Sequence, residues 1–226
     1  DLGLTTGEIA FDWSKIMGRK DKIVDQQRKG LRFLMKKNKI DVIEGHARLT
    51  GRTTVAVTGE DGKSQTLNTK NVLLATGSRV KELPFAQSNG KNILTSDHVL
   101  FIDHVPKKLA VVGGGVVGTE FASLFARMGS EVTIIELFPQ ILPTEDGEVV
   151  KEMVRNLKKQ KIKIDTATKL SKLNDNGKKV VVSCEGKEDR EFDKVLLSIG
   201  REPVTDDLGL DKVCLLYTSD AADDSL

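Results

Sequence analysis

Apolar residues recur at helical spacing along residues 11–38, among many lysines, arginines and glutamines. Ile16, Ile23 and Leu31 lie on one face at this spacing, which predicts a long amphipathic helix. Glycines at positions 18 and 30 argue against its continuity. The pattern then changes to strand-like segments at residues 40–49, 53–58 and 71–77, with a turn at residues 60–63.

The next part of the chain predicts a βαβ unit. Residues 109–112 form a short apolar run of the kind buried on both faces of a parallel sheet. A helix is expected over residues 115–128 and a second strand over residues 131–136, which together span about 30 residues. A further helix is expected from Thr144 to Lys161, because acidic residues open it and basic residues close it. Segments that alternate like antiparallel strands follow at residues 163–173, 178–184 and 190–199, with a turn at residues 174–177.

A glycine pattern lies between the first strand and the helix of this unit. Gly113, Gly115 and Gly118 satisfy Gly-x-Gly-x-x-Gly, with Gly114, Val116 and Val117 between them. Glycine permits a tight turn there, and the amides of the helix N-terminus can bind a pyrophosphate. The alternative interpretation is a glycine-rich turn without a ligand.

Glu136 ends the second strand, 18 positions after Gly118. A carboxylate at about this spacing accepts hydrogen bonds from the ribose hydroxyls of a dinucleotide. It predicts NAD rather than NADP, because a 2′-phosphate would meet a like charge. Glu120, one turn into the helix, is from its spacing a first-turn carboxylate favoured by the helix dipole.

Composition narrows the possible number of domains, partners and locations of the protein. The 226 residues, 38% of them hydrophobic, can form one large or two modest domains. The 35 basic and 33 acidic residues are interleaved, so no basic stripe indicates nucleic acid. No apolar run approaches the roughly 20 residues of a membrane span, and we expect a cytoplasmic protein.

Metal and thiol chemistry are not indicated. His46, His98 and His104 share no ligand spacing, so no metal site is expected. The two cysteines, Cys184 and Cys214, lie 30 positions apart and form no CxxC motif. Cys184 is best explained as a small residue of a strand rather than a nucleophile.

Three motifs in order resemble the pyridine nucleotide-disulfide oxidoreductases, which are flavoproteins with two dinucleotide sites. Residues 105–120 resemble their entry into the NAD-binding domain, and residues 74–78 resemble the ATG motif that precedes it. Residues 198–203 resemble the crossing back to the FAD domain, although Val204 stands where the family usually has Asn. Within the family, residues 36–40, 141–146 and 208–210 most resemble the dihydrolipoamide-oxidising branch.

The resemblance implies an α/β fold, with a Rossmann-type NAD-binding domain inserted into a partial FAD-binding domain. It assigns residues 1–79 to the partial FAD domain, 80–200 to the NAD domain, and 201–213 to the start of the return. Residues 214–226 resemble a translated sequencing adapter. We expect this tail to be foreign and to contribute nothing to stability.

The resemblance also implies which residues contact the cofactors. For NAD they are Gly113, Gly114, Gly115, Val116, Val117, Gly118 and Thr119 around the pyrophosphate, Glu136 at the adenosine ribose, Glu120 near the nicotinamide, and Leu170 and Gly200 lining the site. For FAD they are Ala47, Thr76, Gly77 and Ser78. Ala47 replaces a glycine common in the family.

The family's redox cysteines and first FAD motif would lie before this chain, and its His-Glu base pair after it. We therefore expect no catalytic residue here and no activity from this chain alone. The parent would be a homodimer in 2-oxoacid dehydrogenase complexes, passing electrons from a small-molecule or lipoyl-domain dithiol through FAD to NAD. The alternatives are another branch, such as mercuric reductase, glutathione reductase or soluble transhydrogenase, and a stand-alone NAD-binding module.

Overall fold

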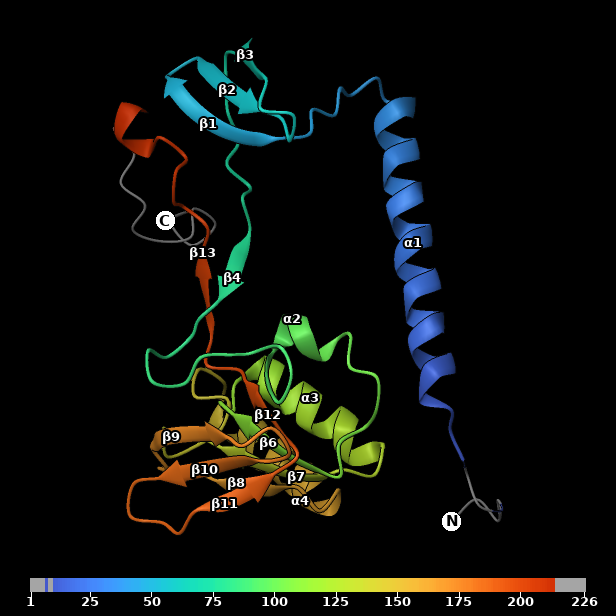
Figure 1. The fold of residues 1–226 in the computed structure, drawn as a ribbon, viewed down its shortest axis with the longest axis vertical. Coiled ribbons are helices and arrows are strands. Elements are labelled where there is room, and N and C mark those ends of the chain that lie inside the picture. Colours follow the sequence, from blue (N-terminus) through green and yellow to red (C-terminus); the bar gives the residue numbers. More distant parts are fainter. Residues whose placement is uncertain (1–6, 8–9, 214–226) are drawn as a thin grey trace. The chain divides into compact units, whose positions relative to one another are not determined.

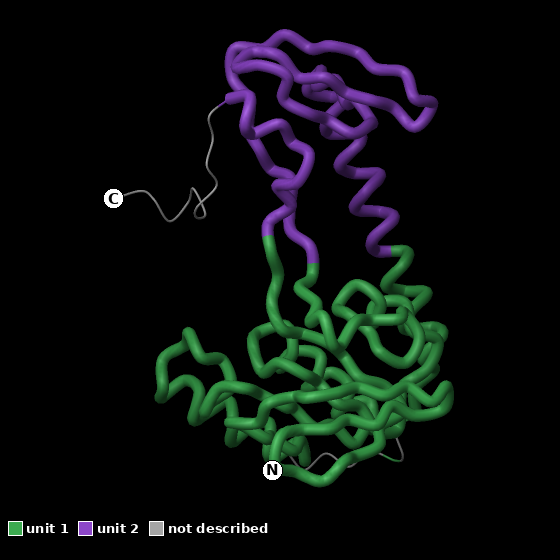
Figure 2. The backbone as a smooth tube through the Cα atoms, turned by 60° about the vertical axis from the view of Figure 1, so that its left-hand side comes forward, with its two compact units in different colours: residues 1–22, 80–202 green, residues 23–79, 203–226 purple. Residues whose placement is uncertain are grey.

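The computed structural model describes residue 7 and residues 10–213 of the chain. The expectation for residues 214–226, Cys214 included, lies outside the described residues. The chain divides into two compact units (Figure 2). Unit 1 comprises the described residues up to Lys22 and Val80–Glu202, and unit 2 comprises Ile23–Arg79 and the described residues from Pro203 on. This division is geometric, and the assignment of a cofactor to each domain stays a prediction.

A five-stranded parallel sheet forms the centre of unit 1 (Figure 1). Its strands, in spatial order, are β5 (Ile93–Thr95), β12 (Lys194–Leu197), β6 (Lys108–Val112), β7 (Glu131–Ile135) and β8 (Lys163–Asp165). The connections are α3 (Val116–Arg127) between β6 and β7, α4 (Gly147–Lys159) between β7 and β8, and the short helix α2 (Ser96–Val99) after β5. The predicted βαβ unit is therefore confirmed.

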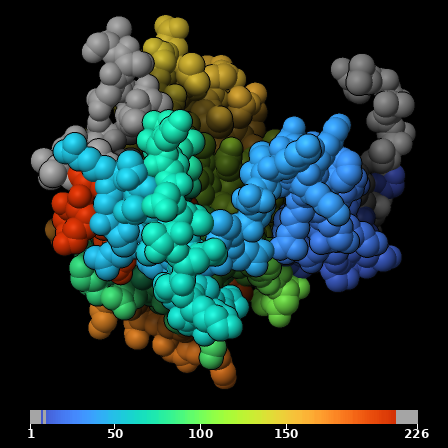
Figure 3. Space-filling view, turned by 90° about the horizontal axis from the view of Figure 1, so that it is seen from above, coloured from blue at the N-terminus to red at the C-terminus, as the bar shows by residue number. Residues whose placement is uncertain are grey.

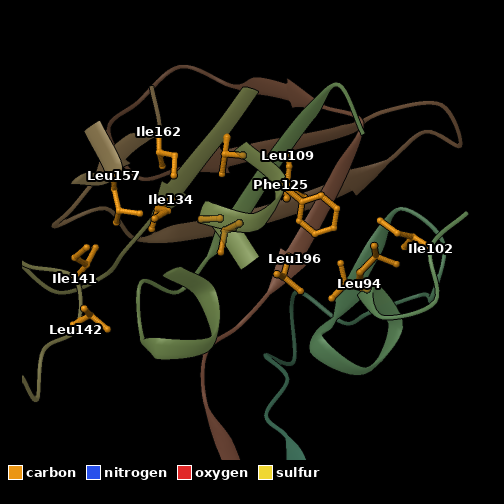
Figure 4. Packing of buried hydrophobic residues seen from close by; sticks show 14 of the residues in the cluster. Leu94, Ile102, Leu109, Phe125, Ile134, Ile141, Leu142, Leu157, Ile162 and Leu196 are labelled. Atoms are coloured by element: carbon orange, nitrogen blue, oxygen red, sulfur yellow. The ribbon is translucent and has the colours of Figure 1, made fainter. Parts of the chain in front are cut away.

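One face of this sheet packs against α3 and α4. Phe125 of α3 is buried among Leu109, Ile134 and Leu196 from three neighbouring strands (Figure 4). Burial of such side chains stabilises the fold by about 1.5–3 kcal/mol each. This packing holds the sheet, which in turn supports the turn that carries the glycine pattern.

The other face carries a second, antiparallel sheet, in which β10 (Val180–Cys184) lies between β9 (Leu170–Asp175) and β11 (Arg190–Phe192). The prediction of three antiparallel strands over residues 163–199 was partly wrong. Residues 163–173 divide into β8 and β9, and residues 190–199 divide into β11 and β12. β8 and β12 join the parallel sheet, because apolar alternation reports burial but not which strand is the partner.

Helix α1 (Trp13–Lys37) is continuous through both of its glycines, so the predicted helix is confirmed. Its first residues belong to unit 1, where Trp13 Nε1 donates to Ile102 O at 3.0 Å and the Trp13 ring lies 6.1 Å from that of Phe125. The rest belongs to unit 2 and buries no side chain. Its surface, blue in Figure 3, exposes the apolar residues Ile23, Val24, Leu31, Phe33 and Leu34.

Unit 2 also contains an antiparallel sheet of β1 (His46–Gly51), β2 (Thr54–Thr58) and β3 (Ser64–Asn68). Leu49 and Val57 are buried, as is Leu208, which precedes the 3₁₀ turn η1 (Leu210–Val213). The predicted strand at residues 71–77 was wrong, since these residues pair with no described strand and Leu73 is 90% exposed.

Two short strands that the sequence did not predict, β4 (Ser78–Val80) and β13 (Arg201–Pro203), pair with each other. They carry the chain out of unit 2 and back into it. The motif at residues 74–78 and the crossing at residues 198–203 therefore meet at one two-stranded connection.

Candidate functional site

The glycine turn connects β6 to α3 at the carboxyl edge of the parallel sheet. Gly113 N donates to Ile135 O at 2.9 Å, which holds the turn against the end of β7. Leu142 N donates to Gly114 O at 2.8 Å from the following loop. Sequence reasoning missed Leu142, and no local pattern marks it as a neighbour of the turn.

The presence of glycine at the three positions of the pattern has different physical explanations. Gly113 has φ +104°, and a Cβ there would lie 2.1 Å from Ser198 O. A Cβ on Gly118 would lie 2.0 Å from Gly113 O. These two glycines are thus required by the packing of the turn. A Cβ on Gly115 would meet nothing within 4 Å, so packing within the protein does not explain this glycine.

Gly115 is also the N-cap residue of α3 and makes no side-chain cap hydrogen bond. The first amides of a helix have no partner within the helix, and they carry the positive end of its dipole. At α4, by contrast, the Asp146 side chain accepts from Glu148 N and Val149 N. The α3 N-terminus can therefore bind an anion in the open space beside Gly115.

Glu136 follows β7 and lies against the glycine turn. Its Oε2 accepts a hydrogen bond from Gly114 N at 2.5 Å, and its Oε1 accepts one from Phe138 N at 2.8 Å. The residue is 5% exposed. The structure thus brings the predicted acidic residue into direct contact with the predicted phosphate-binding turn.

The loop after β8 supports Glu136 from the other side. Glu136 N donates to Asp165 O, and Thr168 N donates to Glu136 O at 2.9 Å. Ala167, with φ +47°, donates its amide to Phe138 O at 2.8 Å. The backbone on which the carboxylate is carried is therefore held by residues 165–168.

The other residues assigned to NAD lie in unit 1 with different surroundings. Glu120 is exposed on α3. Thr119 is buried, and its hydroxyl donates to Gly115 O at 3.0 Å, which gives it a structural role. Leu170 is buried in the core between the two sheets. Gly200 has φ +116°, and its carbonyl accepts from Lys81 N.

The residues assigned to FAD lie in unit 2. The Thr76 hydroxyl donates to Val204 O at 2.6 Å, and Gly77 O accepts from Val204 N at 3.0 Å. Ser78 begins β4, and Ala47 lies on β1 opposite Val57. Val204 therefore makes backbone contacts with the ATG-like motif although it replaces the usual Asn.

Cys184 lies on β10 and is 6% exposed. Burial raises the pKa of its thiol, although the nearby Arg190 acts in the opposite direction. A buried thiol with a raised pKa is unsuited to nucleophilic chemistry.

Within the described residues, no group of three His, Cys, Asp or Glu side chains could hold a metal ion, and no helix could cross a membrane.

The sequence pattern of the pyridine nucleotide-disulphide oxidoreductase family matches residues 4–220. The chain is 38% identical over 212 residues to a dihydrolipoyl dehydrogenase of Bacillus subtilis, covering 93% of this chain and 46% of that protein. Among solved structures, LpdA of Mycobacterium tuberculosis has a TM-score of 0.87 at 26% identity, over 94% of this chain and 48% of that one. The HOCl-induced flavoprotein disulfide reductase RclA of Escherichia coli has a TM-score of 0.81 at 26% identity, over 92% and 47% of the chains. The chain thus spans about half the length of these relatives.

Proposed function

The chain belongs to the pyridine nucleotide-disulphide oxidoreductase family, and from this premise we propose that unit 1 binds NAD within a dihydrolipoamide-oxidising flavoprotein. The observation that carries the proposal is the junction of the glycine turn with Glu136. The open space at Gly115, the uncapped start of α3 and a carboxylate at the next strand end lie together there.

These groups fit the parts of a dinucleotide in order. The amides of α3 would bind the pyrophosphate, and Gly115 would let it approach the backbone. Glu136, held by Gly114 and Phe138, would accept hydrogen bonds from the ribose hydroxyls. Glu120, exposed on the same helix, would lie toward the nicotinamide, with Leu170 and Gly200 as further contacts. The carboxylate favours NAD over NADP, because it repels a 2′-phosphate.

Unit 2 would contribute to an FAD site through Ala47, Thr76, Gly77 and Ser78. Unit 2 buries few apolar side chains, whereas the apolar side chains of its part of α1 and Leu73 are exposed. Exposed apolar residues that gather on one element commonly mark an interface. A longer parent, about twice the length of this chain as its relatives are, would supply the rest of the FAD domain.

In the parent, dihydrolipoamide and NAD⁺ would give lipoamide, NADH and H⁺, with FAD and NAD supplying the redox chemistry. The residues of this chain would bind and orient the cofactors rather than transfer protons. The dithiol would be a small molecule or a lipoyl domain. We further propose that the parent is a cytoplasmic homodimer and a subunit of 2-oxoacid dehydrogenase complexes.

A second candidate is another disulfide reductase of the same family, which the similarity to RclA favours. Mercuric reductase, glutathione reductase and soluble transhydrogenase are further candidates of this kind. The branches that use NADP prefer basic residues near the second strand end, whereas residues 136–139 of this chain contain none. A stand-alone NAD-binding module would not explain the ATG-like motif at Thr76 and Gly77.

Titration of the 226-residue chain with NAD and with NADP tests the proposal. We expect saturable binding of NAD and at least about tenfold weaker binding of NADP, since the loss of one charge-assisted contact has this size. Equal affinity for the two dinucleotides would contradict the role given to Glu136. If neither dinucleotide bound to the folded chain, the proposed NAD site would be wrong.

A further inference from the structure

A pocket of about 490 Å³ lies in unit 1, at the edge of the parallel sheet opposite the glycine turn. Lys108, Glu131 and Lys163 are the first residues of β6, β7 and β8, and all three line it. Arg190, the first residue of β11, lines it from the antiparallel sheet. None of the residues that line the pocket belongs to the proposed NAD site.

The pocket is lined by an excess of positive charge. Its nine lining residues include four cations, Lys108, Lys161, Lys163 and Arg190, and two carboxylates, Glu131 and Glu191. Because Arg190 is paired with Asp165, three lysines remain against two carboxylates, a net charge of +1. Arg190 Nη1 lies 2.7 Å from Asp165 Oδ2, which fixes the guanidinium. None of the three lysines forms an ion pair within the part of the chain that the structure describes.

The nearby aspartates do not neutralise these lysines, because they have other partners. Asp193 accepts a hydrogen bond from Lys108 N at 2.7 Å and forms its ion pair with Lys179. Asp165 is paired with Arg190. Like charges converging in a concave site repel one another and focus a positive potential into it. An anion in the pocket would relieve this repulsion.

We propose that this pocket binds a small phosphate-bearing anion. The volume falls within the usual range of small-molecule sites, about 300–1,000 Å³. Lysine ammonium groups bind phosphate as point charges, and arginine adds a planar set of donors. Glu131 and Glu191 leave acceptors for hydroxyl groups of the molecule that carries the phosphate.

Calorimetric titration of the 226-residue chain with inorganic pyrophosphate, at low salt and with saturating NAD to fill the proposed NAD site, tests the proposal. We expect one bound pyrophosphate, with affinity at least about tenfold weaker after Lys161→Gln combined with Lys163→Gln, since charge-assisted bonds are lost. The matched control is Lys151→Gln combined with Lys172→Gln, which removes the same charge from exposed positions outside the pocket. It should change the affinity by less than about twofold, because screened distant charges contribute little.

Two further titrations test whether the pyrophosphate binds in this pocket and whether the pocket prefers phosphate. Omitting NAD should leave the affinity of the pocket unchanged, and any second pyrophosphate bound then should be insensitive to the lysine substitutions, because the glycine turn contains none of the lining residues. Citrate should bind more weakly than pyrophosphate if the pocket prefers phosphate to carboxylate. Absence of pyrophosphate binding in the presence of NAD, equal losses in the pocket and control variants, or tighter binding of citrate would each overturn the proposal. Circular dichroism of the variants checks that they are folded.

Discussion

The carboxylate of Glu136 accepts a hydrogen bond from the backbone amide of Gly114, with 2.5 Å between Oε2 and N. The residue proposed to recognise the ribose therefore also holds the turn proposed to bind the pyrophosphate. Its second oxygen accepts from Phe138 N, so the carboxylate links the glycine turn to the loop after β7. A substitution at Glu136 acts on both the cofactor and the turn.

We first predict that Glu136→Ala weakens NAD binding by about 10-fold to 100-fold, because charge-assisted hydrogen bonds of about 1.5–3 kcal/mol are lost. NADP binding should weaken little or improve, since the repulsion of its 2′-phosphate is removed. Glu136→Arg should go further and favour NADP. Titration of both dinucleotides against the three proteins measures this.

Glu136→Ala should also lower the free energy of unfolding by about 1.5–3 kcal/mol, because the buried amide of Gly114 and the partly buried amide of Phe138 lose an acceptor. Glu136→Gln is the matched control, since it keeps the size of the side chain and removes its charge. Equal losses of affinity for NAD and NADP would mean that Glu136 serves only the fold.

The second prediction concerns the different effects of substituting Gly118 and Gly115. Gly118→Ala should destabilise the protein by on the order of 3 kcal/mol or more, because its Cβ would lie 2.0 Å from Gly113 O. Gly115→Ala should cost less than about 1 kcal/mol, the usual size of an N-cap change. Thermal unfolding of both variants measures the difference.

Gly115→Ala should nevertheless weaken NAD binding by on the order of tenfold or more, because the added methyl group would occupy the space where a pyrophosphate approaches the backbone. A Gly115→Ala protein that binds NAD as tightly as the original would contradict the placement of the phosphates at α3.

The third prediction concerns Cys184, the buried thiol whose pKa is raised by burial. In a Cys214→Ser background, the folded protein should react slowly with an aromatic disulfide reagent at pH 8, and rapidly once it is unfolded by denaturant. Fast reaction in the folded state would show that Cys184 is accessible.

Cys184 should also make stability depend on pH. The unfolded thiol ionises near pH 8.5, about its ordinary value, whereas the folded thiol stays protonated to higher pH. The unfolded state therefore binds fewer protons above this pH, and the free energy of unfolding falls as pH rises. Cys184→Ala should show a smaller fall between pH 8 and 10, as measured by denaturant titration.

The fourth prediction is that the 226-residue chain does not oxidise dihydrolipoamide and does not purify with stoichiometric flavin. Cys184 is buried on β10 and lies 30 positions from Cys214, so the two do not replace a redox pair in a CxxC arrangement. Absorbance near 450 nm and NADH production measure the two properties. A yellow, active protein would contradict this prediction.

The elements that the sequence predicted well depend on local physical signals. The amphipathic repeat of α1 and the strand–glycine–helix order around Gly113 require neighbours only a few positions away. Other elements were misjudged for the opposite reason. Residues 71–77 have the apolar content of a buried strand but no partner strand in the described residues, and β12 pairs with β5 and β6, about 100 and 85 positions earlier.

The sequence by itself determined the family, through three motifs in order, and it determined that an acidic residue would end the strand after the glycine turn. Only the tertiary structure decided that Gly113 and Gly118 are required by packing while Gly115 faces open space. Only the structure brought Lys108, Lys163 and Arg190 to one pocket. The reason is that periodicity encodes which face of an element is buried, whereas contacts between distant segments form only when whole elements pack together.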